Sequence, residues 1–341
     1  MSYFENFPLV SVCTPTFNRR PFFPNTIKCF LHQDYPLDRM EWIIIDDGSD
    51  PIGDLVKDIP QVKYFYYPDK MRLGKKRNTM HQKCSGEIII YMDDDDYYPP
   101  QRVPHAVDTL LNNTEYLCAG SSAMHIYFKH SNQMYCFGPY RDNHATAATF
   151  AFRRKMLDLT SYNDTTAISE EKDFLKNWTI PIIQLDPMKT ILVFSHIHNT
   201  FDKKELLQQP DSKYRTLTDL KVEDFIKDEK MRHFFMVDID NILSDYEKGE
   251  LKHKPDVVEQ KNTITEQRKQ RIEKEIMKQQ FQHEFQLKET EYKNMISDLK
   301  NKNIKLEDKA IFLENKVTHL ITQLMALKKE QNHKDKIIKS V

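Results

Sequence analysis

The sequence predicts an α/β domain built on a mostly parallel β-sheet and followed by a long C-terminal helix. Over roughly the first 200 residues, short apolar runs alternate with segments of helical character, which is typical of βαβ units. Beyond Pro255 the chain contains neither glycine nor proline, so nothing in its composition interrupts a helix. We therefore expect an α/β domain at 1–205, a helical connector at 206–255 and a long helix at 256–341.

The composition excludes several classes of protein. The net charge of −1 and the pI of about 6.9 give no overall field that would attract nucleic acid. The N-terminal residues lack a signal sequence, and no apolar run approaches membrane-spanning length, so we expect no membrane span and a cytoplasmic location. The five cysteines include no Cys-x-x-Cys pair, which favours reduced thiols over a disulfide framework or a zinc cluster.

The elements follow from the apolar pattern. Asn25 is expected to cap the first helix, and Ser169 the helix that begins with Glu170 and Glu171. The expected strands are 9–16, 42–45, 62–67, 88–92, 124–128, 147–152 and 191–194, and the main expected helices are 27–31, 74–84 and 102–111.

The strand expected at 88–92 runs directly into four consecutive aspartates, Asp93 to Asp96. Adjacent carboxylates repel one another and raise their own pKa values unless a cation lies among them. Hard divalent cations prefer oxygen ligands and bridge readily to phosphate oxygens. The pattern therefore favours a metal site for a phosphorylated ligand, and the alternative is a solvated acidic turn.

A second acidic pair, Asp46 and Asp47, follows the strand expected at 42–45. Parallel strands share a direction, so both clusters should lie along the carboxyl-end edge of one sheet, where ligands of open α/β sheets bind. Alone, Asp46-Asp47-Gly48-Ser49 is also a common turn sequence.

Three segments together resemble the N-terminal signatures of family 2 glycosyltransferases with the GT-A fold. They are Val10 to Arg19, Ile45 to Ser49 and Met92 to Asp96, in the family's order and at its separations. The basic segment from Gly74 to Asn78 resembles the one that the family has between the second and third signatures. Similar proteins are encoded by large DNA viruses, and for a viral protein the expected location would be the host cytoplasm.

The resemblance implies a role for each matching residue. Asp95 would be a metal ligand, with Asp93, His196 and His198 as further candidates and His196 favoured by its spacing from Asn199. Glu171 would be the catalytic base, although the family usually has aspartate there, and Glu170 and Asp173 are the alternatives. The residues expected to bind the nucleotide are Thr14, Pro15, Asn18, Asp46, Asp47, Arg77, Asp93 and Asp94.

These roles imply a metal-dependent, inverting transfer from a nucleotide-sugar, by resemblance a UDP-sugar, to a hydroxyl of a glycan or protein. Mn²⁺ or Mg²⁺ would neutralise the leaving diphosphate, and a carboxylate would take the acceptor proton. One alternative is a coiled-coil scaffold whose transferase domain binds nucleotide without turnover. Another is a nucleotidyltransferase, which would normally show a glycine-rich basic loop where Thr14 to Asn18 stand.

The C-terminal segment carries a heptad pattern. Leucine occupies one seam position five times in succession, at Leu299, Leu306, Leu313, Leu320 and Leu327. The other seam position is held by Ile296, Asn303, Ala310, Val317 and Leu324. This pattern predicts a coiled coil, favours a parallel homodimer and leaves Asn303 to set the register. The alternative is a long helix that folds back on its own domain.

Overall fold

The computed structural model describes residues 7–200, 202–208 and 213–338, with the backbone alone for residues 335–338. Residues 1–6 of the expected α/β domain and 339–341 of the expected tail lie outside the described residues. The chain forms two compact units that divide between Ile264 and Thr265. Within the described ranges, no helix combines the length and the apolarity that a membrane crossing requires.

The first unit is built on a seven-stranded sheet with the strand order β3-β2-β1-β4-β8-β5-β9. The strands β3, β2, β1 and β4 are mutually parallel, and β8 pairs antiparallel with β4. The prediction of a mostly parallel α/β sheet is therefore confirmed. The strands are β1 (Val10–Thr16), β2 (Met40–Asp46), β3 (Val62–Tyr66), β4 (Ile88–Tyr91), β5 (Cys118–Gly120), β8 (Ala151–Arg153) and β9 (Ile182–Gln184).

Both faces of the central strands are buried, which explains their continuous apolar sequences. On β4, Ile88 and Ile90 join one hydrophobic cluster, whereas Ile89 and Tyr91 join the other. The first cluster includes residues of α1 (Phe23–Leu31) and α4 (Arg102–Asn112). The second includes residues of α3 (Leu73–Lys83), so helices cover both sides of the sheet.

A smaller sheet with the order β10-β6-β7-β11 adjoins this core. A single antiparallel bridge between Tyr97 and Leu192 connects β10 to the loop after β4. The smaller sheet consists of β6 (Met124–Phe128), β7 (Gln133–Phe137), β10 (Leu192–Ser195) and β11 (Arg215–Leu217). The remaining α-helices of this unit are α2 (Gly53–Val56), α5 (Glu171–Phe174), α6 (Glu205–Gln208), α7 (Val222–Phe225), α8 (Glu229–His233) and α9 (Ile239–Ser244).

Three local predictions are wrong. Asn25 lies inside α1 and caps nothing, because the chain already turns helical at Arg20–Phe22 and α1 begins at Phe23. Ser169 is not a cap either: its φ of 58° places it in the left-handed region, and Glu170 is the residue that precedes α5. The strand expected at 147–152 is a 3₁₀ turn at Ala147–Thr149 followed by the short strand β8.

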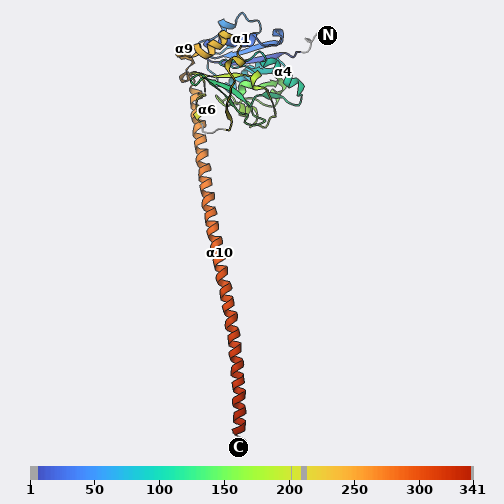
Figure 1. Cartoon of the computed structure of the whole chain (residues 1–341). Coiled ribbons are helices and arrows are strands. Elements are labelled where there is room, and N and C mark those ends of the chain that lie inside the picture. Colours follow the sequence, from blue (N-terminus) through green and yellow to red (C-terminus); the bar gives the residue numbers. More distant parts are fainter. Residues whose placement is uncertain (1–6, 201, 209–212, 339–341) are drawn as a thin grey trace. The chain divides into compact units, whose positions relative to one another are not determined.

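The C-terminal helix α10 runs from Pro255 to Ile338 without a break (Figure 1). Its first ten residues, 255–264, belong to the first unit, and the remainder forms the second unit. The five heptad leucines from Leu299 to Leu327 are each 50–64% exposed. The expected long helix is therefore present, whereas its pairing with a second chain stays a prediction.

Candidate functional site

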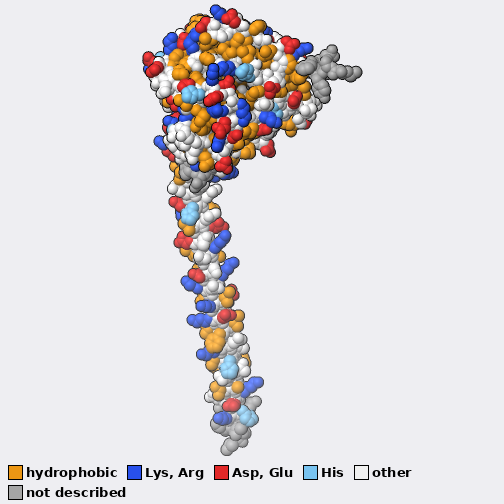
Figure 2. Space-filling model, turned by 45° about the horizontal axis from the view of Figure 1, so that its top comes forward, with side chains coloured by type: hydrophobic (Ala, Val, Ile, Leu, Met, Phe, Trp, Pro, Cys, Tyr) orange, Lys and Arg blue, Asp and Glu red, His pale blue; other side chains and the backbone are white. Residues whose placement is uncertain are grey.

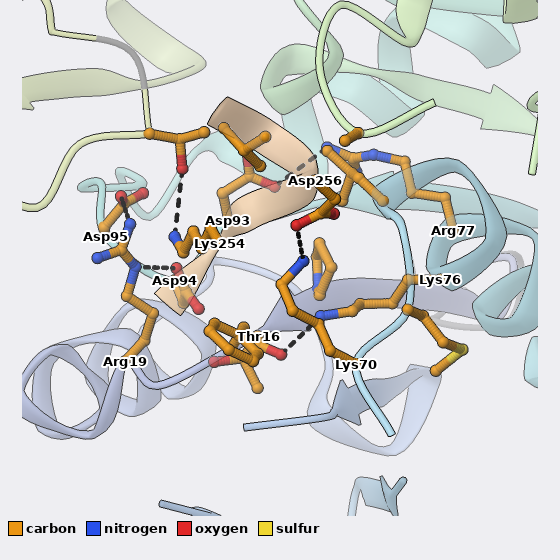
Figure 3. A pocket seen from close by; sticks show the side chains of 17 residues that line it. Thr16, Arg19, Lys70, Lys76, Arg77, Asp93, Asp94, Asp95, Lys254 and Asp256 are labelled. Carbon is orange, nitrogen blue, oxygen red and sulfur yellow. Dashed lines mark hydrogen bonds and ion pairs between the residues drawn. The ribbon is translucent and has the colours of Figure 1, made fainter. Parts of the chain in front are cut away.

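A pocket of about 150 Å³ lies where β1 and β4 end. The two strands are paired in parallel, and the amide of Met92 donates a hydrogen bond to the carbonyl of Cys13, so the loops that follow both strands leave the sheet together. Nine charged side chains line the pocket (Figure 3): Arg19, Lys70, Lys76, Arg77, Lys254, Asp93, Asp94, Asp95 and Asp256. A site with this many buried or partly buried charges suits a charged ligand, because apolar ligands gain nothing from them.

Asp94 and Asp95 share one guanidinium. Arg19 approaches Asp95 Oδ2 with Nη2 at 3.3 Å and Asp94 Oδ1 with Nε at 3.7 Å. Burial and the charge of Asp95 raise the pKa of Asp94 to about 7. Burial also acts against ionised Asp95, but Arg19 and the imidazole of His196 outweigh it and hold the pKa of Asp95 below its usual range. Asp95 is therefore the firmly ionised member of the pair.

Asp93 faces a different cation, Arg77 of α3. The distance from Arg77 Nη2 to Asp93 Oδ1 is 3.6 Å, and Arg77 Nε donates a hydrogen bond of 2.8 Å to Glu170. The guanidinium also lies over the ring of Tyr91, 4.3 Å from its centroid. Asp93 Oδ1 is buried and accepts no hydrogen bond, so its pairing with Arg77 leaves its hydrogen-bonding capacity unused.

The acids expected to supply the base have three distinct environments. Glu170 is buried and paired with Arg77, whereas Asp173 is exposed. Glu171 is partly exposed, no described cation lies within ion-pair distance of it, and burial together with the charge of Glu170 raises its pKa to about 7. The left-handed backbone of Ser169 directly precedes these acids, and such strain often accompanies functional sites.

The pair Asp46 and Asp47 lies at the same sheet edge as the aspartates after β4, as expected, because Asp46 pairs with Thr16 in register. Asp46 accepts hydrogen bonds from the amides of Gly48 and Ile52 and from the hydroxyl of Tyr64. Its carboxylate thus organises the turn after β2, and it does not line the pocket.

The carboxylate of Asp47 likewise accepts hydrogen bonds from within the protein. It accepts hydrogen bonds from the amide of Met71 at 2.6 Å and from Lys76 Nζ at 2.5 Å. Lys76 also donates to the carbonyl of Thr16, so this lysine separates Asp47 from the aspartates after β4. The two acidic clusters therefore share an edge without touching, and base recognition by Asp47 stays a prediction.

Of the three residues expected around the nucleotide in the first loop, Pro15 alone lines the pocket. Thr14 is buried, donating to the carbonyl of Met92 and accepting from the indole of Trp42. Asn18 has a φ of 53° and joins the loop to Asp50 and Lys248. A Cβ on Gly48 would lie 2.6 Å from the amide nitrogen of Asn18, so glycine is needed where these two loops meet.

The structure places His196 and His198 in different surroundings. His196 Nε2 lies 3.4 Å from Asp95 Oδ2, so the structure brings this predicted pair together. Neither histidine lines the pocket itself. The ring of His198 lies beside Tyr246, and its Nδ1 is so close to Gly249 that a Cβ there would clash with it. Its backbone carbonyl instead accepts a hydrogen bond from Arg19.

The fit to a divalent cation rests on few donors. Among the described residues, no three His, Cys, Asp or Glu side chains form a group that could hold a metal ion. Ions that act on nucleotides commonly take one or two carboxylates and complete their shell with phosphate oxygens. Asp95, His196 and Asp93, whose Oδ1 faces Arg77 but accepts no hydrogen bond, fit that arrangement, in which the ligand supplies the missing donors.

Sequence reasoning missed several lining residues. Arg19 was within reach, because it ends the first signature segment, and Lys76 stands next to the predicted Arg77. Lys70 lies in the loop before α3 and carries no motif. Lys254 directly precedes α10 and Asp256 lies in its first turn, about 160 residues after Asp95, and no local pattern marks them.

Comparison with known proteins finds similarity to glycosyltransferases. The family model described as "Glycosyl transferase family 2" matches residues 11–159. An uncharacterized glycosyltransferase of Haemophilus influenzae is 26% identical over 136 residues, which cover 38% of this chain and 49% of the relative. The GalNAc(5)-diNAcBac-PP-undecaprenol beta-1,3-glucosyltransferase of Campylobacter jejuni is 35% identical over 96 residues, covering 26% of this chain and 30% of the relative.

The chain thus spans half or less of the length of these curated relatives. Among solved structures, the mannosyltransferase PcManGT of Pyrobaculum calidifontis in complex with GDP-Man and Mn²⁺ is 17% identical with a TM-score of 0.44. That match covers 55% of this chain and 57% of the other. The family model and the curated relatives support a family 2 glycosyltransferase domain in this part of the chain. Similarity to viral proteins stays a prediction.

Proposed function

We propose that this protein is a metal-dependent, inverting glycosyltransferase that moves a sugar from a nucleotide-sugar to an acceptor hydroxyl. The observation that carries the proposal is the convergence of Asp93, Asp94 and Asp95 with Arg19 and Arg77 in one buried pocket beyond the parallel strands. The match of residues 11–159 to family 2 supports the same reaction class. We take the GT-A arrangement and a UDP-sugar donor from the same resemblance.

The diphosphate of the donor would lie among the charged residues of the pocket. Asp95 and His196 would hold a Mn²⁺ or Mg²⁺ ion, with Asp93 as the further donor. When bound, the ion supplies positive charge to the departing diphosphate, a contribution of several kcal/mol. Arg19 keeps Asp95 ionised, and Arg77 holds Asp93 in place.

Glu171 would accept the proton from the acceptor hydroxyl. As that O–H bond breaks, the acceptor oxygen forms a bond to the anomeric carbon, and the bond from that carbon to the diphosphate breaks with its electron pair leaving on the phosphate oxygen. A single displacement of this kind inverts the anomeric carbon. Glu171 suits the role because its carboxylate is unpaired among the described residues and its pKa is about 7.

The acceptor would be a glycan or a protein, and two chains would be joined through the heptad seam of α10. The seam leucines would pack against the same residues of a second copy, so that large apolar side chains exposed in the single chain become buried. They are Leu299, Leu306, Leu313, Leu320 and Leu327. The heptad spacing selects a second copy of this helix as the partner, since knobs-into-holes packing needs a matching seam.

The test is donor turnover by the full chain with Mn²⁺ and a panel of UDP- and GDP-sugars. We expect one donor to be hydrolysed slowly without acceptor and to stabilise the protein against heat. Nucleotide binding without release of sugar, at every pH between 6 and 9, would instead indicate the scaffold. Failure to bind any of the nucleotides would overturn the proposal.

A further inference from the structure

Residues 254–261, which are Lys254 and the first residues of α10, line one side of the pocket, and we call them the closing segment. Lys254, Asp256 and Val257 line the pocket beside the loops that follow β1 and β4. Residues 254–261 belong to the first compact unit, so their contacts are internal to it. A segment from the far end of the chain therefore completes a site that the N-terminal strands begin.

Side chains of the closing segment contact three regions of the first unit. Lys70 Nζ lies 2.5 Å from Asp256 Oδ1. The side chain of Gln260 accepts a hydrogen bond of 2.6 Å from the amide of Ala167. Lys261 pairs with Glu205 at 2.8 Å. These contacts reach the loop before α3, the loop before α5 and the start of α6, so the segment is held by its surroundings.

Lys254 occupies a position unlike that of its cationic neighbours. It is 7% exposed, and its Nζ donates a hydrogen bond of 3.3 Å to the hydroxyl of Thr200. None of the described carboxylates lies within ion-pair distance of it, whereas Lys70, Lys76, Arg19 and Arg77 each have such a partner. A buried ammonium without a counter-ion is costly and calls for an anion.

The nearest acids do not fill this need. Figure 3 shows Lys254 among Asp93, Asp94 and Asp95, but Arg77 and Arg19 already pair with these three aspartates. Burial and the charge of Arg19 lower the pKa of Lys254 to about 7, although Asp94 and Asp95 act in the opposite direction. The pocket's own acids therefore compensate this lysine incompletely, and an added anion would do so.

We infer that Lys254 binds the diphosphate of the donor, so that the closing segment is part of the nucleotide-sugar site. The inference rests on the proposed function and adds to it a binding residue outside the segment that matches family 2, which ends at residue 159. Four of the five cations that line the pocket pair with acids, two of them with Asp47 and Glu170 outside the lining, whereas Lys254 pairs with none of the described acids. A diphosphate between Lys254, Arg19 and a metal ion on Asp95 would supply negative charge to this lysine.

The test compares the binding of UDP and of uridine to the full-length protein in the presence of Mg²⁺. UDP binding is measured by calorimetry and uridine binding by ligand-observed NMR. GDP and guanosine replace them if UDP does not bind. Lys254→Gln should weaken UDP binding roughly 10- to 100-fold, since a charge-assisted hydrogen bond is lost. Uridine binding should change less than threefold, because the nucleoside does not reach the ammonium. Lys254→Arg should restore most of the UDP affinity.

The matched control is Lys252→Gln, two residues away. Lys252 is half exposed, pairs with Glu247 and Glu250, and does not line the pocket, so UDP affinity should stay unchanged. Equal UDP affinity of Lys254→Gln and the wild type would overturn the inference alone. A parallel loss of uridine affinity would also overturn it, because the lysine would then act through the fold. A wild-type chain that binds neither UDP nor GDP would overturn the proposed function as well.

Discussion

The two compact units of this chain treat apolar and charged side chains in opposite ways. In the first unit, the strands β1, β2 and β4 bury their apolar residues on both faces, and the pocket at their ends buries charges such as Lys76, Arg77 and Asp94. In the second unit the leucines of the heptad seam are exposed, and hydrophobic side chains recur among charged ones along α10 (Figure 2).

This difference indicates that the two units obtain their stability from different sources. The first unit buries an apolar core of its own, and the stability from this core can offset the free-energy cost of burying charged side chains. That cost is high where the charges lack partners. The second unit has no core within one chain, and a lone helix derives little stability from its sequence alone. We therefore expect turnover to depend on the first unit and assembly on the second.

The largest effect should come from the base. Glu171→Gln removes the proton acceptor while keeping the size of the side chain, so turnover should fall by about 10²–10⁴-fold. Asp173→Asn is the matched control, because Asp173 is an exposed acid on the same helix, and it should stay near wild-type activity. Steady-state kinetics of both variants decide the assignment: a severe loss for Asp173→Asn with an active Glu171→Gln would transfer the role to Asp173.

A loss of about 10³-fold is expected for Asp95→Asn, because several kcal/mol of charge stabilisation correspond to that factor. The control is Asp69→Asn, an exposed acid in the loop before α3. Activity should be measured over a range of Mn²⁺ concentrations. If Asp95→Asn keeps more than a tenth of the activity at every concentration, the metal site lies elsewhere.

The pH dependence of turnover should include the titration of Glu171, and comparison with Glu171→Gln separates it from Asp94, whose pKa is also raised to about 7. A base works in its deprotonated form, and burial raises the pKa of Glu171 to about 7, so turnover should decline about tenfold for each unit that the pH falls below 7. Above pH 7 the profile should level off. A rate that is constant down to pH 5 would indicate a base with an ordinary carboxyl pKa, and Glu171 would be excluded.

The smallest effect on turnover, less than twofold, is expected from Leu313→Asp, which should nevertheless separate the proposed dimer. The seam would bury two aspartates where two leucines met, whereas Ile304→Asp, an equally exposed apolar residue outside the seam, should leave association unchanged. Sedimentation of the full chain distinguishes the two. A wild-type chain that sediments as a monomer at micromolar concentration would contradict the dimer and favour a helix that acts alone.

The sequence predicted those parts of the site that depend on strand direction. Asp46 and Asp95 follow strands with obvious apolar runs, and parallel pairing alone brings their loops to one edge. The sequence did not predict which of these acids would be engaged in hydrogen bonds within the protein. Asp46 and Asp47 are taken up by backbone amides, Tyr64 and Lys76, and these contacts depend on how loops fold over one another.

The contribution of the closing segment was out of reach for a different reason. The seven-residue period of α10 is a local property and was visible, but the position of Lys254 depends on contacts of its neighbours with Lys70, Ala167 and Glu205, far away in sequence. Likewise, the pairing of Arg77 with Glu170 joins residues 93 positions apart. Pattern reasoning finds elements and motifs, whereas contacts of this kind need the tertiary structure.

We propose that the aspartates after β4 and a divalent cation hold a nucleotide diphosphate. Anomalous diffraction from crystals soaked with MnCl₂ and UDP would locate both the ion and the nucleotide. We expect a manganese peak beside Asp95 and His196, with the diphosphate between that ion and the side chains of Arg19 and Lys254. Ordered UDP at another place in the chain, or UDP in this pocket with no manganese peak at Asp95, would contradict it.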